Sequence, residues 1–182
     1  MFKNIAKRAM TTKGQRACYV IDHLVEALGN DPSSPLRRAL ILAEIDENPG
    51  ITQADIMVRM DVTKSALNRE IDWLFNYGCI TRNEDGREVR LEVVGYSKKS
   101  LDSAMGYFDG SHKNLKYFLE SYIKVLKQEK PTLRDARIIS TLYEKGKATK
   151  QDVIDTLYKG SPSTDNRAVN KLIEEGIIKA DE

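Results

Sequence analysis

The stretch "FNYGCITRNEDGREVRLEVVG", residues 75–95, holds the end of an apolar helix, a glycine, and two short runs on either side of a polar turn. Gly78 follows the helix directly, at a position where a left-handed backbone costs least for glycine. Two strands, about 79–82 and 87–93, joined by a turn at 83–86, predict a β-hairpin. The sequence therefore places a small charged hairpin immediately after a helix.

Three helices are predicted before this hairpin. The first spans about 36–47 and ends at a Pro-Gly pair. The second follows Thr52, a residue type that caps helices by accepting hydrogen bonds from free amides, and ends near Met60. The third begins at Thr63 and carries a buried apolar stripe, formed by Leu67, Ile71 and Leu74. This order predicts a helix-turn-helix, and a hairpin directly after it is typical of a wing, the alternative being an ordinary solvated hairpin.

Polar residues on the third helix are candidates for contact with DNA. Those on its outward face or at its start are Thr63, Lys64, Ser65, Asn68 and Arg69. Asparagine can pair bidentately with adenine and arginine with guanine, whereas serine and lysine suit phosphates or either base. In the hairpin, Arg87 and Arg90 could reach a minor groove or the backbone, Arg87 being the stronger candidate. Each of these residues can equally be an ordinary solvated side chain.

The segments "LFNYGCITR" (74–82) and "DGREVRLEVVG" (85–95) resemble the MarR family of transcription regulators. The likeness extends over roughly residues 13–128, with Glu92 departing from the threonine that is usual in the family. It implies a winged helix-turn-helix in which Asp85 orients the Arg87 guanidinium through a bidentate pair. It also implies a dimer built from the outer helices, and a small-molecule effector that the sequence does not name.

Two apolar helix faces favour the dimer independently of the resemblance. The first face comprises Cys18, Val20, Ile21, Leu24, Val25 and Leu28, and the second Leu115, Tyr117, Phe118, Tyr122, Ile123 and Leu126. Exposed apolar area of this size usually seeks a partner. The alternative is that the two helices pack on each other within one chain. A dimer would place two recognition helices in successive major grooves of a palindromic operator.

The three-helix pattern occurs twice. Aligning residues 35–56 with 132–153 pairs leucine, arginine, alanine, threonine and aspartate positions, and residues 65–80 align with 163–178 after one insertion. The outward positions of the second copy are Ser163, Thr164, Asn166 and Arg167, with Lys159 and Ser161 nearby. The residues that follow leave room for one strand but not for a hairpin. This wingless copy either reads additional DNA, which we favour slightly, or docks a protein or stabilises a dimer.

We therefore expect a mainly α fold with a small β-hairpin wing, built from tandem winged helix-turn-helix domains plus dimerisation helices. The expected divisions are an N-terminal dimerisation helix (1–34), a winged DNA-binding domain (35–96), dimerisation helices (97–130) and a second, wingless helix-turn-helix domain (131–182).

Composition limits the other functions. The net charge is +2, and residues 35–96 hold eight basic against eleven acidic residues, so the position of the charges matters more than their number. No apolar run reaches the ~18 residues of a membrane helix, and no signal peptide is recognised. Two widely spaced cysteines favour a reducing cytoplasm and no metal site. No catalytic motif is present, so we expect neither an enzyme nor a cofactor.

Cys18 is a redox candidate because some MarR-like regulators sense peroxides through a cysteine in the first helix. Arg16 could stabilise its thiolate. The alternative is a small core residue. The expected function is a dimeric, sequence-specific regulator of double-stranded DNA that acts as a repressor by occupying a promoter. The alternatives are a winged-helix adaptor that binds another protein, and a tandem winged-helix protein of plasmid replication or partition.

Overall fold

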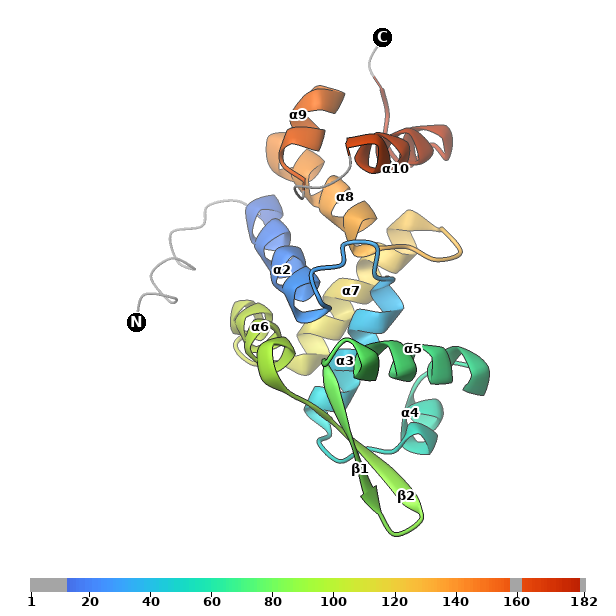
Figure 1. Cartoon of the computed structure of the whole chain (residues 1–182). Helices are drawn as coiled ribbons and strands as arrows, with labels where there is room; N and C mark the ends of the chain where they lie inside the picture. The colour runs from blue at the N-terminus through green and yellow to red at the C-terminus, as the bar shows by residue number, and fades with distance from the viewer. Residues whose placement is uncertain (1–12, 158–161, 181–182) are drawn as a thin grey trace.

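The computed structural model describes residues 13–157 and 162–180. In this part the chain is mainly helical with one two-stranded antiparallel sheet, β1–β2 (Figure 1). The coarse fold class expected from the sequence is confirmed. Two units with the same order of three helices lie toward opposite ends of the ribbon (Figure 1).

The N-terminal unit comprises α3 (Leu36–Glu47), α4 (Gln53–Arg59) and α5 (Lys64–Asn76). The Thr52 hydroxyl accepts from the Asp55 amide and the Asp55 carboxylate accepts from the Thr52 amide, which closes a capping box at α4. Thr63 caps α5 by accepting from the Ala66 amide at 3.2 Å. The three helix boundaries predicted from these residues are confirmed.

The hairpin pairs β1 (Ile80–Asp85) with β2 (Glu88–Val93). Its turn is Gly86–Arg87 rather than the predicted 83–86, so the first strand is longer than expected. Asp85 lies opposite Glu88, and Gly86 takes the left-handed φ of +64° that a two-residue hairpin turn requires. The arginine predicted to begin the second strand therefore lies at the tip of the hairpin.

The hairpin is joined to the loop before α4. The Gly50 amide donates to the Leu91 carbonyl at 2.8 Å, and the Leu91 amide donates to the Ile51 carbonyl at 3.0 Å. Leu91 is completely buried beneath this bridge. The strand β2 thus closes one side of the N-terminal core.

The C-terminal unit comprises α8 (Leu133–Lys145), α9 (Lys150–Asp155) and α10 (Pro162–Glu174). Capping boxes at Thr132 and Thr149 begin α8 and α9. The residues described after α10, 175–180, form no strand, so the single strand expected there is not found. The second unit therefore repeats the helices of the first without its hairpin.

The remaining helices are α2 (Lys13–Ala27), α6 (Gly95–Met105), the short 3-10 helix η1 (Gly106–Phe108) and α7 (His112–Leu126). Helix α2 packs against α6 and α8, and its entire predicted dimer face is buried within the chain. The expectation that this face meets a second copy is wrong, because α6 and α8, both distant from α2 in the sequence, pack against this helix. The approach is so close that a Cβ at Gly14 would lie 2.5 Å from the Glu144 backbone nitrogen.

The two units are joined where their first helices begin. The Leu36 amide donates to the Pro131 carbonyl at 2.9 Å, and the Leu133 amide donates to the Ser34 carbonyl at 3.0 Å. Leu36 and Leu133 occupy equivalent positions of the repeat, so the two bonds are reciprocal. This exchange relates the two helix starts by a local two-fold symmetry.

Candidate nucleic-acid interface

Half of the eight basic residues between 35 and 96 are neutralised by acidic neighbours. The ion pairs are Arg38–Glu70, Arg59–Glu44, Arg82–Asp72, and Arg90 with Asp85 and Glu88. Lys116 of α7 also contacts Glu44 and Glu47, and Lys98 and His112 contact Asp46. Many of the acidic residues of this segment are therefore paired with basic residues of the same chain.

Three other basic residues of the segment remain on the surface. Lys64 and Arg69 lie on α5, and Arg87 lies in the turn at the hairpin tip. All three are exposed, and none forms an ion pair with any residue in 13–157 or 162–180. The hairpin projects beyond α4 and α5 (Figure 1), so its tip forms an outlying part of the same end of the molecule.

Arg87 is not oriented by Asp85. The Asp85 carboxylate accepts instead from Arg90 Nε at 3.0 Å, and Arg90 also donates to Glu88 at 2.7 Å and to the Gly50 carbonyl at 3.0 Å. Because Asp85 lies opposite Glu88, and Arg90 is two residues further along β2, the three side chains share one face of the hairpin. The predicted Asp85–Arg87 pair is wrong. Arg90 instead links the hairpin to the loop before α4 through its hydrogen bond to the Gly50 carbonyl.

The polar residues of α5 have different roles. Thr63 has its hydroxyl engaged in the helix cap, whereas Ser65 is exposed. Asn68 is also exposed, and its side-chain oxygen accepts from Gln53 Nε2 at 2.6 Å. Gln53 is the first residue of α4, so this hydrogen bond holds the Asn68 side chain against the neighbouring helix. Gln53 was not among the residues predicted from the sequence, although its place at the start of the second helix could have indicated it.

The corresponding residues of the C-terminal unit lie in the first turns of α10. Arg167 is exposed, and its Nε donates to the Ser163 carbonyl at 3.4 Å. Asn166 donates to the Pro162 carbonyl at 3.0 Å, and Thr164 is half-buried. Lys159 and Ser161, the other two candidates of this copy, lie outside the described residues. Near this end of the chain, Lys150 of α9 donates to Asn170 of α10 at 2.7 Å, linking the two helices as Gln53 and Asn68 do in the first unit.

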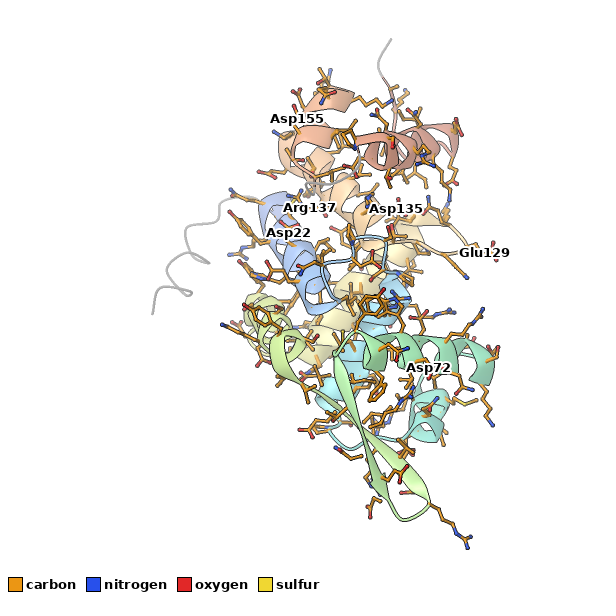
Figure 2. The ribbon with its side chains drawn as sticks, viewed as in Figure 1. Asp22, Asp72, Glu129, Asp135, Arg137 and Asp155 are labelled. Carbon is orange, nitrogen blue, oxygen red and sulfur yellow. The ribbon has the colours of Figure 1, made fainter. Side chains whose placement is uncertain are left out.

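Cys18 lies in the contact between α2 and α8. Its sulfur accepts from Arg137 Nη1 at 3.1 Å, and Arg137 Nε also donates to Asp22 at 2.9 Å; both residues are labelled near α2 in Figure 2. Burial raises the pKa of the Cys18 thiol, against the opposing effect of Arg137. A raised pKa lowers the thiolate fraction, so the geometry favours a core residue over a peroxide sensor.

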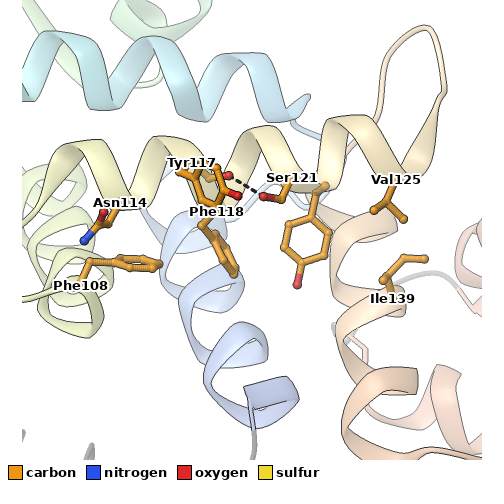
Figure 3. Close-up of a pocket in the computed structure, with 8 residues that line it drawn as sticks. Phe108, Asn114, Tyr117, Phe118, Ser121, Val125 and Ile139 are labelled. Atoms are coloured by element: carbon orange, nitrogen blue, oxygen red, sulfur yellow. Dashed lines mark hydrogen bonds between the residues drawn. The ribbon is translucent and has the colours of Figure 1, made fainter.

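The outer side of α7 retains an exposed apolar surface. A groove of about 470 Å³ runs along it, lined by Phe108, Asn114, Tyr117, Phe118, Ser121, Tyr122, Val125 and Ile139 (Figure 3). Tyr117 is 71% exposed and Val125 54% exposed. Of the two faces expected at a dimer interface, only part of this one is open.

The described part of the chain lacks two further features. No group of three or more histidine, cysteine, aspartate or glutamate residues there is arranged to hold a metal ion. No helix there has both the length and the apolar character needed to cross a membrane.

Comparisons of the chain with protein-family models, with curated proteins and with solved structures gave no match. The resemblance to the MarR family therefore stays a prediction.

Proposed function

We propose that the chain is a sequence-specific regulator of transcription that binds double-stranded DNA through a winged helix-turn-helix. In this proposal α4 and α5 form the helix-turn-helix, and β1–β2 is the wing. The observation that carries it is the position of three cations that pair with no acid in the described part of the chain: Lys64, Arg69 and Arg87 lie exposed on α5 and at the hairpin tip, while neighbouring arginines are paired with acids.

In this arrangement α5 enters the major groove. Asn68, held by Gln53, is placed to read adenine, and Arg69 to read guanine. Lys64 and Ser65, in the first turn of α5, contact phosphates, and the helix N-terminus itself favours anions. Arg87 at the wing tip reaches the backbone or the adjacent minor groove, where a narrow groove concentrates negative potential.

A homodimer fits this function through the groove on α7, since the apolar face of α2 is already buried. Two copies would then meet two half-sites of a palindromic operator, and occupation of a promoter would repress transcription. The second unit extends the recognised site through Ser163 and Arg167. In this proposal the protein acts in the cytoplasm.

The proposal is tested by selecting duplexes from a random library with the full-length protein at physiological salt. Enrichment of an inverted repeat, with half-sites about ten base pairs apart, is the expected result. Specified bases outside that repeat would assign DNA contact to the C-terminal unit as well. Recovery of no preferred sequence, together with weak salt-sensitive binding, would overturn the proposal in favour of a protein-binding adaptor.

A further inference from the structure

A groove in the C-terminal unit lies at the position that β2 occupies in the N-terminal unit. In the N-terminal unit, the Gly50–Ile51 segment pairs with Leu91 of β2 through two backbone hydrogen bonds. The equivalent segment of the repeat is Lys147–Ala148. Among residues 13–157 and 162–180, no strand pairs with it. The backbone segment that β2 covers in the first unit therefore has no strand beside it in the second, among the described residues.

Beside this edge the surface is hollowed by a groove of about 650 Å³. Its apolar lining is formed by Leu142, Ala148, Val153, Val169, Ile173 and Ile178. Val153 and Val169 are only 2% and 3% exposed, while Ile173 and Ile178 are half-buried. The floor of the groove is therefore part of the core between α8, α9 and α10, and its upper side is open to solvent.

The rim of the groove is positively charged. Lys147, Lys150 and Lys179 line it, and all three are exposed. The acidic residue of the lining is Asp152, whose carboxylate accepts from the Thr149 amide at 3.0 Å in the α9 cap. An occupant with carboxylates along its length would therefore find complementary charge on the rim.

We propose that this groove binds an extended strand of a partner protein, in which apolar residues alternate with acidic ones. The strand adds to the Lys147–Ala148 edge, so its backbone supplies hydrogen bonds while alternate side chains fill the groove. Lys147 exchanges its present amide bond, to the Lys145 carbonyl at 2.9 Å, for one to the strand, as Gly50 bonds Leu91 in the first unit. This docking is independent of the proposed DNA contact.

The pattern of β2 supports the choice of occupant. Leu91 and Val93 are buried against the N-terminal unit, while Glu88 and Glu92 on the opposite face of β2 remain exposed. In a strand with this alternation, the apolar side chains of one face can pack on the apolar floor of the groove. The charged side chains of the other face then stay exposed. The lysine rim of the second unit favours acids at every outward position.

The probe is a fluorescein-labelled peptide copying residues 87–94 with Arg87→Glu and Arg90→Glu, titrated with the full-length protein and followed by anisotropy. Saturable binding is expected, and the double variant Lys147→Glu/Lys179→Glu should weaken it about tenfold, as expected when two partly exposed ion pairs are removed. The matched control Lys113→Glu/Lys124→Glu makes the same change of net charge on exposed residues of α7 and should leave the affinity unchanged.

Ile178→Asp tests the apolar floor at a residue beyond α10, and circular dichroism verifies that the helices persist. It should also weaken the peptide by about tenfold or more, because a carboxylate would face the apolar groove. Hydrogen exchange should slow at the amide of Lys147 when the peptide is bound. Absence of saturable binding, equal weakening in the control, or full affinity in Ile178→Asp would each overturn the proposal.

Discussion

The two three-helix units solve the same packing problem with similar contacts and then diverge at their surfaces. In each, an arginine of the first helix pairs with a buried acid of the third: Arg38 Nε lies 2.6 Å from Glu70, and Arg134 Nε lies 3.0 Å from Asp165. The N-terminal unit then adds a hairpin with a cationic tip, whereas in the C-terminal unit no strand among the described residues pairs with the Lys147–Ala148 segment. A repeated scaffold can therefore hold two different surfaces.

The largest expected effect comes from breaking the arginine–acid pair between the first and third helices of each unit, which the two units form at positions that the repeat alignment does not match. Arg38→Met should lower the free energy of unfolding by about 3–5 kcal/mol, because Glu70 would stay buried without a counter-charge. Arg134→Met should cost less, since Arg38 also lies 3.8 Å from the Trp73 ring centroid. Urea unfolding of both variants measures the difference. A larger cost for Arg134→Met would contradict the added contribution of the contact between Arg38 and Trp73.

Docking of the C-terminal unit on α2 is tested at Gly14. Gly14→Ala places a methyl group against the Glu144 backbone and should destabilise the chain by about 1–3 kcal/mol. Gly106→Ala is the matched control, because its φ is −58° and the added carbon meets no described atom within 4 Å apart from its chain neighbours and its own helix backbone. That variant should be neutral or slightly stabilising. Equal effects in thermal unfolding would contradict the close approach of α2 to α8.

Smaller effects are expected from pH, with opposite signs at two similar caps. Hydrogen bonds from Thr149 lower the pKa of Asp152, so its contribution is present above the unfolded pKa and lost as pH falls through the folded pKa. Burial raises the pKa of Asp135. The folded chain therefore loses stability as the pH rises through the interval between the unfolded and the folded pKa of this carboxyl group.

Thermal unfolding of Asp152→Asn and Asp135→Asn between about pH 2 and 6 separates the two cases. The first variant should lose less stability than the wild type on acidification. The second should lose less on the return to higher pH. Identical pH profiles for both variants would mean that burial does not distinguish the caps.

Much of the architecture of the two units could be predicted because local chemistry fixes it. Thr52 and Thr63 cap helices where they were expected to, and Gly78 takes a φ of +72° after α5. The repeat in the sequence also predicted the helix order of the second unit. These features depend on residues close together in the chain.

The features that could not be predicted depend on distant partners or on register. The apolar face of α2 could not be assigned from its own pattern, because an exposed dimer face and a face covered by α8 look alike in sequence. The partner of Asp85 is Arg90 instead of Arg87 because a shift in the turn moves every cross-strand neighbour. The reciprocal bonds of Leu36 and Leu133 involve backbone atoms, which leave no side-chain signature.

The proposal that α5 and the hairpin tip form the DNA-binding surface is tested most directly by the salt dependence of duplex binding. The triple variant Lys64→Ala/Arg69→Ala/Arg87→Ala should reduce the slope of log affinity against log salt by about two, because Lys64 and Arg87 each neutralise one phosphate in the complex while Arg69 reads a base. The control triple Lys99→Ala/Lys113→Ala/Lys124→Ala removes three exposed lysines of α6 and α7 and should leave the slope unchanged. Equal slopes in the two variants would contradict the assignment of α5 and the hairpin tip as the DNA-binding surface.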